Sequence, residues 1–203
     1  MLVNEFLEQS AKQFPNKVAL VCQTKRLSYI QIENAANSLA NALIFHGLHK
    51  QDRAAIYMEN SIESVISIFG ILKASGIFVI INPQVKSKKL EYMLNDCKVK
   101  ILITDEYKHD NSLLCNFEDA LKHPITRPLN NSIDMDLASL IYTSGSTGNP
   151  KGVMLTHLNM VSAANSIIEY LENTNEDIIL NCLPLSFDYG LYQIYQEEVS
   201  LLE

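Results

Sequence analysis

Short apolar runs alternate with segments of helical periodicity along most of this chain, and this alternation limits its fold more than any other feature. The clearest run is residues 77–81, Ile-Phe-Val-Ile-Ile, which no polar residue interrupts. A strand of this kind is expected where both faces of a sheet are covered. Because strand–helix–strand connections within one sheet are right-handed, the alternation predicts an α/β fold with an open, mostly parallel sheet and helices on both faces.

The limits of the elements follow from the same pattern and from residues that start or stop helices. Ser28 and Gln31 form a capping-box pair at one helix start, and Asn60-Ser61 begins another helix. Strands are expected over residues 18–22, 26–28, 53–58, 77–81, 99–104, 137–142, 152–155 and 178–183, and helices over 2–14, 28–47, 60–73, 87–95 and 156–171. Between them, prolines and asparagines predict an internal linker over residues 122–136, preceded by a short helix around 117–121.

The overall composition argues against several classes of protein. Hydrophobic residues make up 47% of the 203 residues and charged residues 19%, which is typical of a folded chain. The net charge of −7 argues against general binding to nucleic acid, which depends on clustered lysine and arginine, but is compatible with a site for one nucleotide. The one dense basic stretch, Lys86, Lys88 and Lys89, is interpreted as the solvated start of a helix.

Cysteines, histidines and hydropathy give no sign of a metal centre or a membrane anchor. The 4 cysteines include no Cys-x-x-Cys pair, and the 5 histidines show no ligand spacing. No apolar run approaches the length of a membrane span, and the N-terminus lacks the basic-then-apolar layout of a signal peptide. We therefore expect a soluble, cytoplasmic protein with reduced thiols, no metal ligands and no membrane span.

The clearest chemical signal is the segment of residues 142–152, Tyr-Thr-Ser-Gly-Ser-Thr-Gly-Asn-Pro-Lys-Gly, which joins two predicted strands. Its hydroxyls, its flexible backbone and the charge of Lys151 suit a loop that wraps the β- and γ-phosphates of ATP. The P-loop pattern fails because Lys151 follows Pro150, and the glycine spacing fails the dinucleotide fingerprint. A Ser/Gly-rich hairpin turn without a ligand is the simpler alternative.

At every signature position this segment resembles the phosphate-binding motif of the adenylate-forming superfamily, which includes acyl-CoA synthetases, luciferases and nonribosomal-peptide adenylation domains. Further segments that resemble the family are residues 27–29, 72–79, 82–83 and 183–190. The resemblance covers residues 1–196 and implies part of the large N-terminal domain of the adenylate-forming fold.

The resemblance implies a reaction in which Mg-ATP and a carboxylic or amino acid form an acyl-adenylate and pyrophosphate. The acyl group then passes to the thiol of CoA or of a carrier protein. Lys151 would stabilise phosphate charge in this reaction. By position, the residues that would contact ATP are Thr143, Ser144, Gly145, Ser146, Thr147, Gly148 and Lys151.

Two residues near the end of the resemblance are candidates for the acyl substrate. Asp188 follows an aromatic residue, as in amino-acid-activating members, where this carboxylate holds the substrate ammonium. An acid that opens a helix explains Asp188 equally well. Phe187 fits either the substrate wall or the core. His157 falls in the first turn of its helix and is assigned no catalytic role.

The chain departs from the family in what it lacks. The segments that bind adenine, ribose and Mg²⁺, and the one with the catalytic lysine, do not occur in these 203 residues. Residues 1–203 are therefore interpreted as an incomplete, truncated AMP-binding N-terminal domain that is inactive alone and has uncovered apolar faces. The alternative is a non-catalytic nucleotide-binding or interaction module that a separate chain completes in trans. A dinucleotide-binding oxidoreductase is disfavoured by the absent fingerprint.

Overall fold

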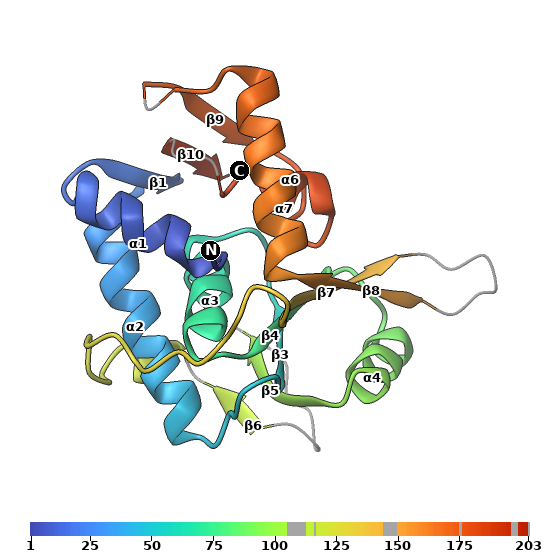
Figure 1. Ribbon diagram of the computed structural model, residues 1–203. Coiled ribbons are helices and arrows are strands. Elements are labelled where there is room, and N and C mark those ends of the chain that lie inside the picture. Colours follow the sequence, from blue (N-terminus) through green and yellow to red (C-terminus); the bar gives the residue numbers. More distant parts are fainter. Residues whose placement is uncertain (105–112, 116, 144–149, 175, 196–198, 203) are drawn as a thin grey trace.

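The computed structural model describes residues 1–104, 113–115, 117–143, 150–174, 176–195 and 199–202, whose strands form two sheets (Figure 1). The six-stranded sheet has the order β6-β5-β3-β4-β7-β8, and the four-stranded sheet has the order β2-β1-β10-β9. The strands are β1 (Val18–Cys22), β2 (Lys25–Ser28), β3 (Arg53–Tyr57), β4 (Ile77–Ile80), β5 (Val99–Thr104), β6 (Leu113–Cys115), β7 (Leu137–Thr143), β8 (Lys151–Thr156), β9 (Ile178–Asn181) and β10 (Val199–Leu202). The helices are α1 (Asn4–Gln13), α2 (Tyr29–Phe45), α3 (Ile62–Lys73), α4 (Ser87–Asp96), α5 (Phe117–Ala120), α6 (His157–Leu171) and α7 (Asp188–Tyr192).

The predicted α/β class and mostly parallel pairing are confirmed, with the strands divided between two sheets instead of one. The pairs β3–β4, β3–β5, β4–β7 and β5–β6 are parallel, as are β1–β10 and β10–β9. The pairs β1–β2 and β7–β8 are antiparallel. Only two residues separate β1 from β2, and a parallel neighbour would need a crossover of about a dozen residues or more.

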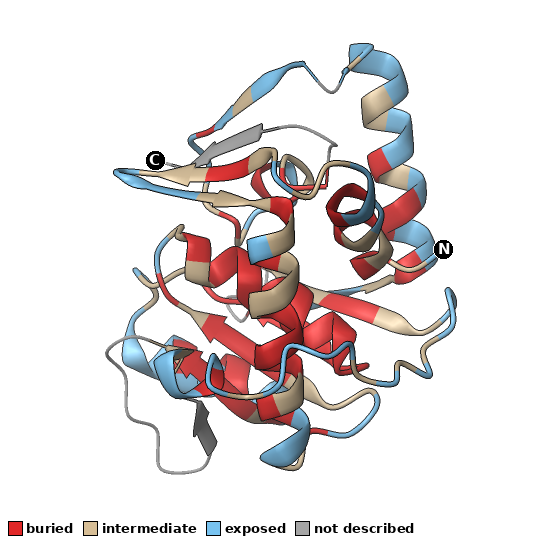
Figure 2. Cartoon of the chain, turned by 90° about the vertical axis from the view of Figure 1, so that its left-hand side faces the viewer, coloured by how far each residue is buried: buried red, intermediate tan, exposed pale blue. Residues whose placement is uncertain are grey.

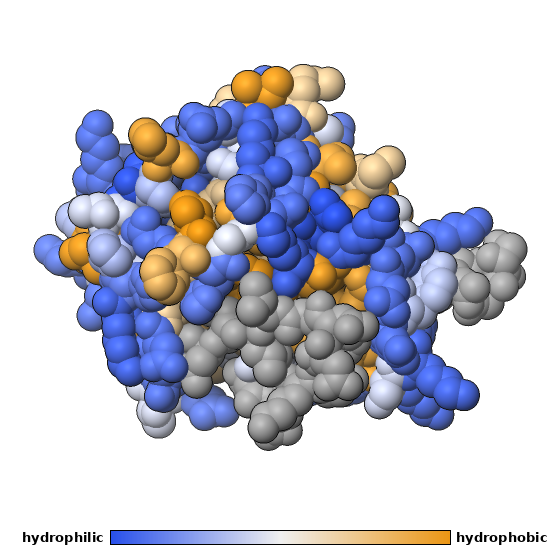
Figure 3. Space-filling view, turned by 90° about the horizontal axis from the view of Figure 1, so that it is seen from below, coloured by the Kyte–Doolittle hydropathy of each residue, from blue (hydrophilic) through white to orange (hydrophobic). Residues whose placement is uncertain are grey.

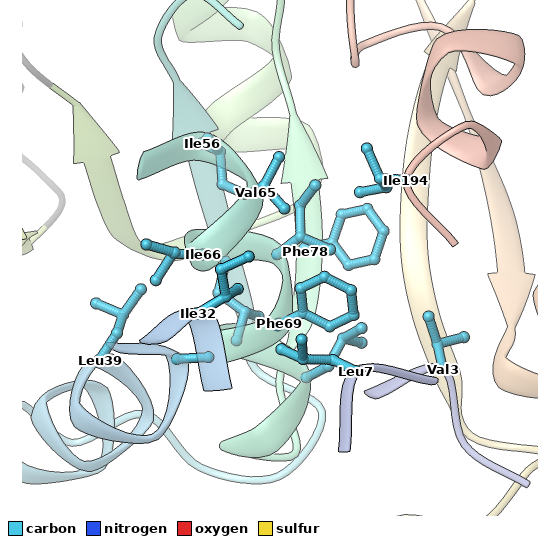
Figure 4. Close-up of a cluster of buried hydrophobic side chains, with 14 of the residues drawn as sticks. Val3, Leu7, Ile32, Leu39, Ile56, Val65, Ile66, Phe69, Phe78 and Ile194 are labelled. Carbon is cyan, nitrogen blue, oxygen red and sulfur yellow. The ribbon is translucent and has the colours of Figure 1, made fainter. Parts of the chain in front are cut away.

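The central strands are buried on both faces, as residues 77–81 predicted. Phe78 and Ile80 of β4 belong to the larger core cluster, which includes α2 and α3, whereas Val79 packs with Leu90 and Met93 of α4. Figure 4 shows Phe69 of α3 lying beside Phe78 of β4, and Figure 2 shows buried residues concentrated in this region. Helices therefore cover both faces of this sheet, and its open sites are the strand ends.

The start signals of the helices act as the sequence predicts. The backbone N–H of Ser28 donates to Gln31 Oε1 at 2.8 Å, which confirms the capping pair at the start of α2. At α3, Ser61 Oγ accepts from the backbone N–H of Ser64 at 3.0 Å. These bonds satisfy amide groups that have no partner inside the helix.

The segment that the sequence assigns to a linker lies against the helical layer. Asn41 of α2 donates to the carbonyls of Pro124 and Thr126 at 2.7 and 2.8 Å. Asn130 donates to the carbonyl of Leu72 at 2.9 Å. The short helix expected around residues 117–121 is present as α5, while β6 had no signal strong enough to predict it.

A buried ion cluster joins the three N-terminal helices. Lys73, at the end of α3, is 1% exposed, and its ammonium lies 2.9 Å from Glu8 Oε1 of α1 and 2.8 Å from Glu33 Oε1 of α2. Arg127 contacts the other oxygen of Glu8 at 2.8 Å. Burial alone would raise the pKa of Glu8, but the hydrogen bond and charge of Lys73 outweigh it and hold that pKa below its usual range.

Replacing Lys73 with methionine should destabilise the fold strongly, because it would leave Glu33 buried without its cation and Glu8 with Arg127 as its one remaining cationic partner. We expect a loss of about 3–5 kcal/mol in the free energy of unfolding measured in urea at pH 7. Lys25→Met is the matched control, since Lys25 pairs with Glu63 at 2.9 Å but is 68% exposed. The control should cost less than about 1 kcal/mol. Equal losses in the two variants would show that burial of the pair is unimportant.

Candidate functional site

A cleft of about 1010 Å³ lies beyond the carboxyl ends of two neighbouring strands of the six-stranded sheet. Ile80 and Asn82 line it at the end of β4, and Thr143 lines it at the end of β7. The start of α4 and the start of α7 supply further walls. Ligands of open α/β sheets bind outside the carboxyl ends of strands, so this is the position at which a site is expected.

The β7–β8 hairpin places part of the predicted phosphate segment at this cleft. Thr143 pairs with Lys151 across the two strands, and both side chains are exposed. Pro150, directly before Lys151, is buried and lines the cleft. The other predicted residues, Ser144, Gly145, Ser146, Thr147 and Gly148, lie outside the described residues. The structure therefore describes only the base of this loop.

Tyr142, the first residue of the predicted phosphate segment, is anchored to α4. Its hydroxyl donates to Asp96 Oδ2 at 2.6 Å, and Met93 O lies 3.4 Å away. Burial, followed by the hydrogen bond to Asp96, raises the pKa of Tyr142 well above its usual value. The phenol therefore remains a proton donor throughout the ordinary pH range.

The two predicted substrate residues lie on the opposite wall. Phe187 is 58% exposed and lines the cleft, so it lies outside the core. Asp188 lines the same cleft as the first residue of α7, and its Oδ1 accepts from the backbone N–H of Tyr189 at 2.8 Å. The structure therefore brings Thr143, Phe187 and Asp188 to one cavity.

Three lysines that the sequence analysis assigned only to a solvated helix start also belong to the cleft. Lys86, Lys88 and Lys89 are exposed, as expected of a solvated helix start, yet all three also line the cleft. The signal that could have found them is their position, because they follow the strand that ends at Ile80. With them, the cleft has positive charge on one wall, which favours an anionic ligand.

His157 takes no part in the cleft. It is the first residue of α6 and is 1% exposed, and its Nδ1 accepts the backbone N–H of Val3 at 3.1 Å. Burial lowers the pKa of His157 to about 4. In its neutral state, His157 holds the N-terminal segment against the start of α6.

The cleft at the carboxyl ends of β4 and β7, with lysines along one wall, defines an α/β protein whose open strand ends are available to a ligand. The chain belongs to the AMP-binding enzyme family, whose model matches residues 7–196. It corresponds to the N-terminal part of the AMP-binding domain, which confirms the resemblance found in the sequence.

Relatives and solved structures agree with this assignment. Tyrocidine synthase 1 from Brevibacillus parabrevis is 33% identical over 207 residues, which cover 98% of this chain and 19% of the synthase. The inhibitor-bound N-terminal domain of FACL13 from Mycobacterium tuberculosis superimposes with a TM-score of 0.92 at 25% identity, covering 100% of this chain and 57% of that chain. O-succinylbenzoate coenzyme A synthetase (MenE) from Bacillus subtilis, in complex with AMP, gives a TM-score of 0.89 at 25% identity, with coverage of 98% and 44%.

The chain therefore spans less than a fifth of tyrocidine synthase 1 and little more than half of the FACL13 domain. No helix within the described part of the chain is long and apolar enough to cross a membrane.

Acidification should destabilise the fold through His157. The pKa of His157 is about 4 in the folded state and 6.5 for an ordinary histidine side chain, so between these values the unfolded state binds one more proton than the folded state. The free energy of unfolding should therefore fall by about 1–3 kcal/mol as the pH drops through this window. His157→Asn can still accept the Val3 N–H and should lose this part of the pH dependence in urea titrations. An unchanged slope in the variant would contradict the assignment.

Proposed function

We propose that this chain is the ATP-phosphate-binding portion of an AMP-forming carboxylate or amino-acid ligase. The observation that carries the proposal is the position of Thr143, which lines the cleft on the carboxyl side of the sheet and pairs across the hairpin with Lys151. Membership of the AMP-binding family supports ATP as the nucleotide.

The described residues suit the binding of a polyphosphate. Thr143 offers a hydroxyl donor, and Lys151 offers an ammonium on an exposed side chain that can follow a phosphate. Lys86, Lys88 and Lys89 add positive charge on the facing wall. Donors and cations placed in this way stabilise the negative charge that develops on a pyrophosphate leaving group.

Phe187 and Asp188 support a carboxylic or amino acid as the second ligand. Both line the cleft, where an apolar ring and a carboxylate would contact the acyl side of the substrate. A carboxylate is the natural partner of a substrate ammonium, so Asp188 favours an amino acid over a plain acyl chain. The acceptor of the acyl group would be the thiol of CoA or of a carrier protein.

Mg²⁺ would accompany ATP in this family, but the described residues do not fit a metal ion. No group of three or more His, Cys, Asp or Glu side chains is arranged to hold one in that part of the chain. We propose that the ligand of the metal is provided by residues outside this part of the chain.

The first test is direct binding of pyrophosphate and ATP by calorimetry. We expect weak binding to the wild type and a Kd raised about 10- to 100-fold in Lys151→Ala, because a charge-assisted contact is lost. Lys12→Ala, an exposed lysine on α1, is the control and should bind like the wild type. Equal Kd values for all three proteins would exclude Lys151 from the site.

The second test concerns turnover. We expect no carboxylate-dependent exchange of pyrophosphate into ATP by the isolated chain above the level of Lys151→Ala, because groups that position the nucleotide and the acid provide much of the rate. Exchange that depends on an added amino acid and is lost in Asp188→Ala would refute inactivity, while supporting the role of Asp188.

A second candidate function, an interaction module completed in trans, is favoured by the distribution of exposed apolar side chains. Among the described residues, 10 of the 19 large apolar side chains that are exposed lie between residues 153 and 189, and they include Met154, Ile178 and Tyr189. The strands in this region, β8 and β9, are both edge strands. On the face seen from below, by contrast, the surface is mostly hydrophilic and its apolar patches are separate (Figure 3).

Completion in trans predicts a complex with a chain that carries the rest of an AMP-binding domain. The isolated protein should bind such a chain, and Ile178→Lys, which puts a charge on the exposed face of β9, should weaken the complex at least tenfold. Leu129→Lys, a 90% exposed position outside this region, is the control. Size-exclusion chromatography with light scattering would measure the association, and equal effects of the two substitutions would reject the surface.

A further inference from the structure

The last turn of α4 is tied to the base of the β7–β8 hairpin by one short hydrogen bond. Tyr142, the penultimate residue of β7, donates its hydroxyl proton to Asp96 Oδ2 at 2.6 Å. Asp96 is the final residue of α4. An O–H···O⁻ bond of this length belongs to the stronger class of charge-assisted hydrogen bonds.

The end of α4 is a chemically suitable place for such a donor. The last carbonyls of a helix lack partners inside it and carry partial negative charge. Met93 O accepts from Cys97 Sγ at 3.0 Å and lies 3.4 Å from the Tyr142 hydroxyl. Met93 O already accepts from the backbone N–H of Cys97 at 3.2 Å, so the main acceptor of the phenol at this helix end is the carboxylate of Asp96.

On the hairpin itself, the ring of Tyr142 lies against Gly152. The two residues are directly opposite in the antiparallel ladder, and a Cβ added at Gly152 would lie 3.4 Å from Cζ of Tyr142. The next pair along the ladder is Thr143 and Lys151. Both strands at the base of the loop are therefore coupled to the orientation of one aromatic ring.

The hairpin has little other support at this point. β8 is an edge strand whose only neighbour among the described strands is β7, and its first four residues are exposed. Figure 1 shows the hairpin projecting from the body of the molecule on the side of α4. A strand with one neighbour can twist and fray, so a tether beside Lys151 has a large effect on its position.

We propose that Asp96 is a positioning residue that, through Tyr142 and Gly152, fixes Thr143 and Lys151 in the orientation that presents them to the cleft. Asp96 itself would touch no ligand. The inference rests on the proposed function for the identity of the ligand, a polyphosphate. The claim that Asp96 fixes the position of β8 does not depend on the ligand and is supported by the contacts of Tyr142 with Asp96 and Gly152.

The experiment compares Asp96→Ala, Asp96→Asn and Tyr142→Phe with the wild type. Asparagine keeps a carbonyl oxygen that can accept from the phenol, so Asp96→Asn is the rescue variant. Glu91→Ala, an exposed acid on the same helix, is the matched control for loss of a negative charge. Two readouts are recorded: hydrogen exchange of the amides of β8, and the Kd for inorganic pyrophosphate by calorimetry.

Asp96→Ala and Tyr142→Phe should each speed the exchange of the β8 amides and raise the Kd by about tenfold, because each removes the same bond. The double variant should show no more change than Tyr142→Phe alone, since Asp96 acts through the phenol. Asp96→Asn should recover most of both effects, and Glu91→Ala should show neither. The exchange of the β3 amides should stay constant throughout, which separates a local effect from global unfolding.

Several results would overturn the proposal. Unchanged β8 exchange in Asp96→Ala would show that the bond does not fix the hairpin. Faster exchange with an unchanged Kd would reduce the bond to a purely structural role. Absence of pyrophosphate binding by the wild type would instead refute the proposed function. The exchange data alone would then decide whether Asp96 fixes the position of β8.

Discussion

The ammonium of Lys73, enclosed between two glutamates, is the interaction on which the arrangement of the helices depends. Its partners, Glu8 and Glu33, belong to α1 and α2, so a single buried cation fixes three helices relative to one another. Apolar contacts tolerate sliding and repacking, whereas a buried charge has very few acceptable positions. The cluster therefore specifies one packing of the layer that covers the inner face of the six-stranded sheet.

Because helices cover both faces of the six-stranded sheet, a ligand can reach only its strand ends and its edges. Since α2 and α3 cover one face and α4 the other, the remaining accessible parts are the strand ends and the edge strands. The cleft uses the carboxyl ends of β4 and β7, and its walls come from the segments that follow these strands. Residues far apart in the sequence, such as Lys86, Thr143 and Asp188, meet there because parallel strands end at the same side.

The sequence was most informative where local chemistry decides the structure. The caps at Ser28 and Ser61, the doubly covered strand at residues 77–81 and the hairpin at residues 142–152 could all be predicted, because each depends on neighbours in the chain. The bond between Tyr142 and Asp96 could not, since these residues lie 46 positions apart. The division into two sheets could not either, because it depends on the pairing of β1 with β10 at the other end of the chain. For the same reason, the place of Lys86 in the cleft was missed.

The pairing of Tyr142 with Gly152 also limits how the segment can change in evolution. Side chains alternate between the two faces of a strand, so a slip of β8 by one residue would exchange the faces on which Gly152 and Lys151 lie. The lysine would then meet the tyrosine ring beside α4, and a residue without a side chain would face the site. An insertion or deletion that shifts the ladder by one position would therefore remove Lys151 from the face that it shares with Thr143.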